Sequence, residues 1–183
     1  MDLDPPIPAA TLIVFRPDAA GLPDILIVER TAAMAFAGGA IVFPGGRVDA
    51  GDVALATALG RPADAPRITA IRETVEESAV LVGIRATSPV NSVLGLTLQD
   101  ELIRGGDFAE LLAANDLTLD LEALTMFARW MPAFKQARRF DTLFFIASAL
   151  PGPWPPRPQP GECQSARWAS AASILGRIET GQD

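Results

Sequence analysis

The sequence predicts an α/β fold, and two observations support this prediction. The chain has 183 residues, of which 49% are hydrophobic and 20% charged, and this composition excludes an intrinsically disordered chain. Short β-branched apolar runs alternate with segments of helical periodicity, which favours a layered α/β fold over an all-α or all-β one. We expect one domain over residues 1–183, with flexible ends at 1–10 and 181–183.

Strands are predicted where short apolar runs meet turn-forming residues. Residues 11–16 and 24–30 are such runs, and a stretch rich in turn formers separates them, so we expect a β-hairpin with a long loop. Residues 40–43 predict a third strand, which Pro44 should end and which a glycine-rich bend should follow. Further strands are expected over 124–130, 140–149 and 162–169.

Helices are predicted where apolar residues recur at helical spacing or where helix formers dominate. We expect them over 52–59, 67–82, 98–114 and 170–179. The second of these should end at Gly83, and Gly105-Gly106 weakens the third. Residues 151–161 are rich in proline and should form an extended loop.

The residues that the chain lacks exclude several kinds of site. There is no His and one Cys, Cys163, so His-ligated zinc, catalysis by Ser-His-Asp or Cys-His, and an internal disulfide are excluded. The net charge of −7 argues against nonspecific binding to nucleic acid or to an anionic membrane. The N-terminal residues do not resemble a signal peptide, and no apolar run reaches the roughly 20 residues of a membrane helix, so we expect a cytoplasmic protein.

The predicted helix over 67–82 carries three acidic residues on one face. Glu73, Glu76 and Glu77 share a sector of about 100° on a helical wheel, opposite the apolar residues, so this face should point away from the core. Like charges at these spacings destabilise a helix by a few tenths of a kcal/mol. The face is therefore either a solvated surface on which Arg72 pairs with Glu76, or a platform of oxygen ligands for Mg²⁺ or Mn²⁺.

A glycine pair at the end of the third predicted strand bears on this choice. Gly45 and Gly46 follow Pro44, and glycine lets the backbone approach another group closely. A bare Gly45 carbonyl there would be available as a further metal ligand. The alternative is an ordinary hairpin turn.

Together, the loop and the helix resemble the Nudix hydrolase signature. That signature runs Gly, five residues, Glu, seven residues, then Arg-Glu-apolar-x-Glu-Glu-x-Gly-apolar. Gly46 matches the opening glycine, Asp52 stands where the first glutamate belongs, and residues 72–80 match the second half. The segment before Arg72 is longer than in the pattern. Thr74 replaces an apolar residue, and Ala79 replaces the last glycine, a mild change if that backbone stays helical.

This resemblance implies a Nudix-type α/β/α sandwich with a mixed β-sheet, and metal-dependent hydrolysis of a diphosphate bond in a nucleoside diphosphate-linked small molecule. It implies that Glu76 and Glu77 bind Mg²⁺ or Mn²⁺ and that Glu73 either binds it or deprotonates the attacking water. Arg72 would hold Glu73, the Gly45 carbonyl would complete the metal shell, and Asp52 would support the site from behind. The composition permits a homodimer.

Several segments outside the signature resemble the branch typified by peroxisomal-type coenzyme A diphosphatases. They are Arg30, residues 34–39, 41–49, 127–130, 138–142 and 162–168. Gly39 is placed as in the coenzyme A signature, whereas Ala35 stands where that signature has an arginine. Coenzyme A or its acyl derivatives are the first expected substrates. The alternatives are ADP-ribose or NADH-type dinucleotides, or a noncatalytic module that binds a nucleotide or a protein.

Other polar residues are weaker candidates for the site. Glu162 is either an additional base or ligand, or an exposed residue at the start of a strand. Arg47, Arg138 and Arg139 are candidates for binding the substrate phosphates, with solvated basic residues as the alternative. Asp141 is expected to cap a turn.

The aromatic residues and the cysteine are expected mainly in the core. We assign Phe127, Phe144 and Phe145 to it, and Cys163 to a buried or half-buried position. The three tryptophans could stack on a base or on pantetheine, but core positions are favoured; they are Trp130, Trp154 and Trp168.

Overall fold

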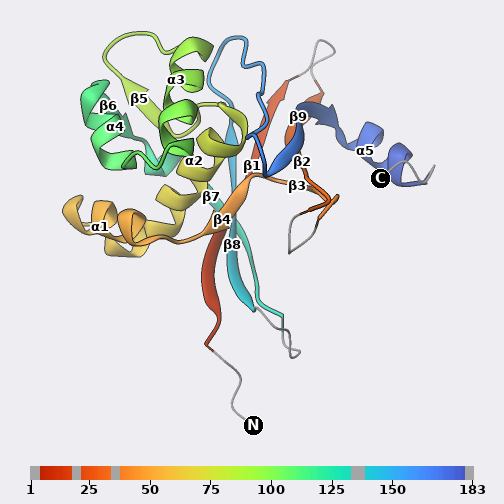
Figure 1. Cartoon of the computed structure of the whole chain (residues 1–183), viewed down its shortest axis with the longest axis horizontal. Coiled ribbons are helices and arrows are strands. Elements are labelled where there is room, and N and C mark those ends of the chain that lie inside the picture. The colour runs from red at the N-terminus through yellow and green to blue at the C-terminus, as the bar shows by residue number, and fades with distance from the viewer. Residues whose placement is uncertain (1–4, 18–21, 34–37, 133–138, 180–183) are drawn as a thin grey trace.

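The computed structural model describes residues 5–17, 22–33, 38–132 and 139–179, and Figure 1 shows the chain. Within these residues, a main sheet of seven strands follows the order β3-β2-β1-β8-β7, while β4 pairs with β1 and β9 pairs with β2. Its strands are β1 (Ile7–Pro17), β2 (Pro23–Arg30), β3 (Ile41–Val42), β4 (Gly45–Arg47), β7 (Thr125–Trp130), β8 (Phe140–Ser148) and β9 (Cys163–Ser170). The sheet is mixed, because β1 and β8 run parallel and the other pairs antiparallel.

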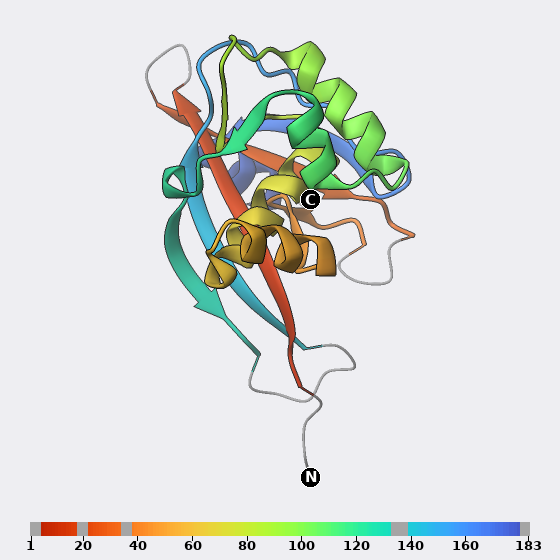
Figure 2. The same cartoon turned by 90° about the vertical axis from the view of Figure 1, so that its left-hand side faces the viewer.

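Helices α1 to α4 cover one side of this sheet, and α5 lies beyond its other side, attached to β9 (Figures 1 and 2). The helices are α1 (Ala50–Ala58), α2 (Ala65–Ser78), α3 (Ser92–Ile103), α4 (Phe108–Ala114) and α5 (Ala171–Glu179). A small second sheet pairs β5 (Ile84–Ala86) with β6 (Leu117–Leu119). These observations confirm the predicted α/β class with a mixed sheet. In the described part of the chain, no helix is long and apolar enough to cross a membrane.

The core lies between α2 and the middle of the main sheet. The apolar face of α2 packs on alternate residues of β1, and all of them are fully buried: Ile68, Ile71 and Val75 on the helix, and Ala10, Leu12 and Val14 on the strand. Burial of each large side chain contributes about 1.5–3 kcal/mol. This packing fixes α2, and with it the acidic residues on its other face.

The helix predicted to continue to Gly83 ends at Ser78. Ala79 takes the left-handed conformation with a φ of 59°, and its N–H donates to the carbonyl of Val75 at 2.8 Å. The backbone does not stay helical there, so the replacement of the signature glycine by Ala79 is not a mild change, because an L-residue is strained in this region. Thr74 tolerates its buried position because its hydroxyl donates to the Ala70 carbonyl at 2.7 Å.

Two other predicted elements differ from the structure. The glycine-rich bend after Pro44 is partly a strand, since Gly45–Arg47 pairs with β1. The single helix expected over 98–114 is two helices, α3 and α4, which the residues around Gly105-Gly106 separate. Helix α3 begins earlier than the predicted residue 98, because the Asn91 side chain accepts from the N–H of Leu94 and caps the N-terminus of the helix.

The structure also corrects the predicted flexible end at residues 1–10, because β1 begins at Ile7. Residues 1–4 and 180–183 lie outside the described part of the chain. The other predicted strands and short helices are present with small shifts of their ends.

Strand β7 is the last strand on its side of the sheet, and its aromatic residues are exposed. Phe127 and Trp130 are 66% and 62% exposed, so their predicted core positions are wrong. Trp154 and Phe145 are buried, and Trp168 is half-buried, with its ring N–H on the Trp154 carbonyl at 2.7 Å. Phe127 lies at an irregularity in the pairing with β8, which turns it out of the regular alternation of faces.

Candidate active site

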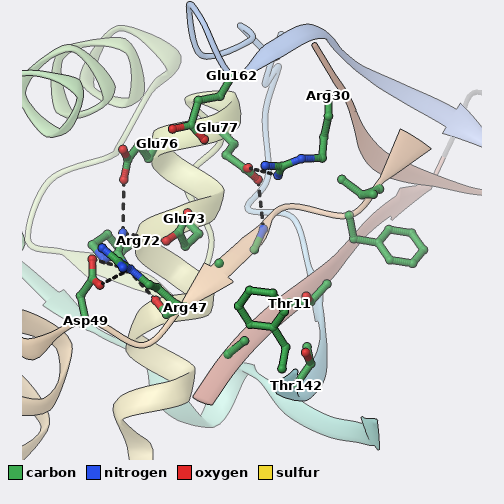
Figure 3. A pocket seen from close by; sticks show the side chains of 16 residues that line it. Thr11, Arg30, Arg47, Asp49, Arg72, Glu73, Glu76, Glu77, Thr142 and Glu162 are labelled. Atoms are coloured by element: carbon green, nitrogen blue, oxygen red, sulfur yellow. Dashed lines mark hydrogen bonds and ion pairs between the residues drawn. The ribbon is translucent and has the colours of Figure 1, made fainter. Parts of the chain in front are cut away.

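The three acidic residues of α2 face a cavity of about 590 Å³ rather than open solvent (Figure 3). These residues lie on the face of α2 opposite its apolar core residues, as predicted, but Glu77 is only 2% exposed, so this face is not a solvated surface. Strand β4 packs beside α2, and Glu73, Glu76 and Glu77 line the cavity together with Gly45, Gly46 and Arg47 from this strand. The cavity then continues over Ala9, Thr11, Phe140 and Thr142 on the main sheet.

Arg72 connects the acidic residues of α2 to Asp52 of α1. Its Nε and Nη2 donate to the two oxygens of Asp52, both at 2.9 Å, and its Nη1 lies 2.9 Å from Glu73 Oε1 and 3.2 Å from Glu76 Oε2. Burial alone lowers the pKa of this guanidinium, but the hydrogen bonds to Asp52 and the charges of Glu73 and Glu76 outweigh it, so the pKa lies above its ordinary value. The Thr69 hydroxyl also donates to Asp52, so this carboxylate holds Arg72 and does not line the cavity beside the acids.

Burial without enough positive charge leaves the acids of α2 difficult to ionise. Burial raises the pKa of Glu73 to about 7, against the opposing charge of Arg72. Burial, and then the charge of Glu73, raise the pKa of Glu77 to about 8. Burial likewise raises the pKa of Glu76, again against Arg72. Such a cluster would be stabilised by an added cation.

The two glycines of β4 allow the strand to approach α2 closely. The N–H of Gly45 donates to Glu77 Oε2 at 3.0 Å. A Cβ at Gly46 would lie 2.3 Å from Glu73 Oε1, so a larger residue there would displace that carboxylate, and a Cβ at Gly45 would lie 2.4 Å from the backbone carbonyl oxygen of Ala10. On the other side of Glu77, Arg30 Nη1 from β2 lies 3.6 Å from Oε1. The sequence shows no local pattern that would assign this contact to Arg30.

The proline-rich loop before β9 brings two further polar residues to the acids. Glu162 is exposed and lines the cavity, and its charge adds to the raised pKa of Glu76 and Glu77. The Gln159 side chain donates to Glu76 Oε1 at 3.2 Å. The structure therefore places Glu162 beside the acidic cluster, as its predicted role requires, and adds Gln159, which no sequence motif identifies.

The basic candidates lie in different places. Arg47 lines the cavity with an exposed side chain, 3.1 Å from Asp49. Arg139 is not among the described residues that line the cavity, although the next residue, Phe140, is. Arg138 lies outside the described residues. Asp141 is in strand β8 and pairs with Arg129 at 2.7 and 2.6 Å, so its predicted role as a turn cap is wrong.

Cys163 is buried, as predicted. Burial raises the pKa of its thiol to about 12, so the reactive thiolate is scarce at neutral pH. This residue therefore has the properties of a small apolar side chain rather than of a nucleophile.

The chemistry of the acidic cluster fits an oxygen-preferring divalent cation. Five carboxylates line one cavity, those of Asp49, Glu73, Glu76, Glu77 and Glu162, and Mg²⁺ binds through carboxylates together with substrate phosphates. Among the residues that the structure describes, no three acidic or thiol side chains converge as a formed metal cage. Their oxygens are instead occupied by Arg72, Arg30 and the Gly45 N–H. The donor set, rather than its present spacing, fits Mg²⁺ or Mn²⁺.

Comparison with solved structures places this site in a known fold. The chain is similar to a NUDIX hydrolase from Alicyclobacillus acidocaldarius, with 32% sequence identity, a TM-score of 0.80, and coverage of 97% of this chain and 85% of that one. It also resembles the NUDIX domain of Shewanella oneidensis NrtR complexed with ADP ribose, at 12% identity, a TM-score of 0.54, and coverage of 95% and 79%. A C. elegans Ap4A hydrolase binary complex matches at 15% identity and a TM-score of 0.50, over 94% of this chain and 86% of that one.

Two other comparisons find nothing. No protein-family model matches the sequence. No curated protein matches it. The structural match to the Alicyclobacillus protein, at 32% identity over nearly the whole chain, agrees with the acids, arginine and glycines gathered around one cavity. The chain belongs to the Nudix hydrolase family.

Proposed function

We propose that this hydrolase cleaves the diphosphate bond of a nucleoside diphosphate derivative, with coenzyme A or acyl-coenzyme A as the preferred class. The observation that carries the proposal is the convergence of Glu73, Glu76 and Glu77 on one cavity, with Arg72 bound to two of them. A binding module would have no use for three crowded acids whose pKa burial raises. An enzyme that binds a cation and a diphosphate needs such a cluster.

Each residue of the cluster has a separate role in this proposal. Glu76 and Glu77 would hold a divalent ion together with the Gly45 carbonyl; when bound, such an ion would supply positive charge next to the diphosphate and lower the pKa of a water molecule. Arg72 positions Glu73 through a charge-assisted hydrogen bond. Glu73, with a pKa of about 7 because of its burial, is suited to accept a proton near neutral pH.

Residues at the edge of the cavity complete the roles. Glu162 is the second candidate for the base, because its exposed carboxylate faces the same cavity. Arg47 of β4 contacts a substrate phosphate. Its side chain is exposed, so it can exchange its ion pair with Asp49 for this contact. Positioning and charge stabilisation, rather than covalent chemistry by the protein, then account for most of the catalysis.

Two observations bear on the substrate. The cavity extends from the acids over small and apolar side chains of the sheet, among them Ala9, Thr11 and Phe140, which suits a substrate with an uncharged arm. The segments that resemble coenzyme A diphosphatases include Gly39 in its expected place. ADP-ribose and NADH-type dinucleotides are the second candidates, and the ADP ribose bound by the Shewanella domain supports them.

A product assay tests the proposal. Purified protein with Mn²⁺ is incubated with coenzyme A, acetyl-coenzyme A, ADP-ribose, NADH and diadenosine compounds, and the phosphate products are separated by chromatography. We expect cleavage of the diphosphate in coenzyme A with the highest kcat/KM. Higher kcat/KM on ADP-ribose or NADH would overturn the coenzyme A assignment. Absence of turnover on every compound, with no Mn²⁺-dependent rise in Tm, would support the noncatalytic alternative.

A further inference from the structure

The C-terminal turn of α2 is tied to the proline-rich loop before β9 by a set of backbone contacts. The last carbonyls of a helix have no partner within it. Here the N–H of Arg157 donates to the Ser78 carbonyl at 2.9 Å, and the N–H of Gln159 donates to the Glu77 carbonyl at 3.3 Å. The loop therefore follows the end of the helix that carries the acids.

Gln99 of α3 fixes this loop from the other side. Its side chain is fully buried, and its Nε2 donates to the carbonyls of Glu76 and Arg157, each at 2.9 Å. Its Oε1 accepts from Nε of Arg157, whose Nη2 in turn donates to Asp100. Every polar atom of the buried amide is thus satisfied, and a satisfied buried network holds its members in one arrangement.

Gln159 extends this network to a carboxylate of the site. Its Nε2 donates to Glu76 Oε1 at 3.2 Å, while Arg72 Nη1 holds the other oxygen, Oε2, at 3.2 Å. Its own carbonyl accepts from the N–H of Cys163 at 3.0 Å, and this turn carries Glu162 to the cavity (Figure 3). The two oxygens of Glu76 are therefore held by one donor from its own helix and one from the distant loop.

We propose that Gln159 is a positioning residue, whose amide restrains the Glu76 carboxylate beside the cavity as a ligand for the divalent ion, and that Gln99 and Arg157 keep Gln159 in place. This inference depends on the proposed function, in which Glu76 is a ligand. A neutral amide orients a carboxylate without adding a positive charge that would repel a cation. Partners of this kind typically change metal affinity or activity by 10–100-fold when they are removed.

The test is the substitution Gln159→Met, which keeps the length of the side chain and both backbone hydrogen bonds but removes the donor. Mn²⁺ affinity is measured by electron paramagnetic resonance of the free ion, with no substrate present. We expect Kd for Mn²⁺ to rise about 10-fold and kcat to fall by a similar factor, with KM nearly unchanged and the Tm of the metal-free protein within a few degrees of wild type. Gln164→Met is the matched control, because Gln164 is exposed on the following strand, and we expect it to behave as wild type.

A double-mutant cycle separates positioning from a general structural role. If Gln159 acts through Glu76, then Gln159→Met has no further effect on Mn²⁺ affinity in a Glu76→Gln background. Equal effects of Gln159→Met in both backgrounds would overturn the proposal, and so would wild-type affinity in the single variant. If Gln159→Met fails to fold, Gln159→Asn keeps the amide but withdraws it by one methylene, and the same loss of affinity is expected.

Different outcomes would overturn the metal site and the positioning role of Gln159. Mn²⁺ binding that is absent in wild type, or equal in wild type and Glu77→Gln, would overturn the metal site itself. Normal binding in wild type, loss in Glu77→Gln and no change in Gln159→Met would overturn only the positioning role.

Discussion

Two arginine–aspartate pairs in this protein have nearly the same geometry and different surroundings. Arg72 donates two hydrogen bonds to Asp52 at 2.9 Å, and Arg129 donates two to Asp141 at 2.7 and 2.6 Å. The first pair is buried and extends to Glu73, whereas the second lies on the exposed edge of the sheet. The two pairs therefore differ in burial and in their connection to further charges rather than in geometry, and only the first pair adjoins the proposed site.

The largest expected effect is that of Arg72→Met. Removal of one partner of a buried pair leaves uncompensated charge, here on Asp52, Glu73 and Glu76. We expect the free energy of unfolding to fall by about 3–5 kcal/mol and activity to be lost, as measured by urea denaturation and by product formation. Arg72→Lys should recover only part of both, because it lacks the two-pronged geometry. A loss below about 1 kcal/mol, the range of exposed pairs, would remove the contrast between the two pairs.

Glu77→Gln should affect catalysis more than folding. The substitution keeps the shape of a buried side chain but removes a proposed metal ligand, so we expect kcat to fall by at least ~100-fold with little loss of stability. Steady-state kinetics with Mn²⁺ measure this. Glu110→Gln, on the exposed surface of α4, is the control and should retain normal turnover. Near-normal kcat in Glu77→Gln would contradict the ligand role.

The buried cluster should also make the metal-free protein sensitive to pH. Burial raises the pKa of Glu73 to about 7 and of Glu77 to about 8, above the unfolded value of about 4.3. Between these values the folded state binds more protons than the unfolded state, so the free energy of unfolding falls as pH rises from about 5 to 8. The slope should be on the order of 1 kcal/mol per pH unit. The chain has no His, so few other groups titrate in this window.

Melting curves from pH 5 to 8.5 measure this slope, once with a chelator and once with Mn²⁺. We expect Mn²⁺ to flatten it, because the ion favours the ionised carboxylates, and Glu77→Gln to reduce it. If the stability of the metal-free protein were constant or increased over this range, burial would not raise the pKa of these carboxylates.

Ala79→Gly tests whether the end of α2, rather than its charges, limits stability. Ala79 has a φ of 59°, where glycine avoids the strain of a side chain, so we expect a gain of about 0.5–1 kcal/mol, seen as a higher Tm by calorimetry. Ala54→Gly, at an exposed position within α1, should have the opposite sign, since glycine destabilises a helix interior. A loss of stability in both variants would show that burial of the Ala79 methyl group stabilises the protein by more than the positive φ of this residue destabilises it.

Arg129→Met should have the smallest effect. Its pair with Asp141 lies on the exposed edge of the sheet, where water replaces the lost contacts. We expect Tm and kcat/KM to equal those of wild type within error. Loss of activity in this variant would place the edge of the sheet within the substrate-binding surface.

Much of the fold follows from local patterns. Apolar runs separated by turn formers predict β1 and β2, and helical periodicity predicts α2. The patterns do not predict that α2 ends at Ser78, because Ala79 has no intrinsic preference for a positive φ. They also place Phe127 and Trp130 in the core, since a sequence does not tell which strand lies at the edge of a sheet.

The residues of the site also fall into those that the sequence predicts and those that it does not. Glu73, Glu76 and Glu77 can be predicted because they lie within one helical turn and form a recognisable spacing. Arg30, Gln99 and Gln159 reach the same helix from β2, α3 and a loop, and no spacing within the sequence relates them to it. Only the packing of the whole sheet and helical layer brings them together.

The restraint on Glu76 has a consequence for biosynthesis. Gln159 follows Glu76 by 83 residues, and ribosomes add about 5–20 residues per second. A nascent chain therefore carries its acidic helix for several seconds before the loop that orients it has been translated. In the proposed mechanism, hydrolytic competence therefore arrives late in synthesis, after β1 to β8 and α1 to α4 have been translated and while β9 is still to follow.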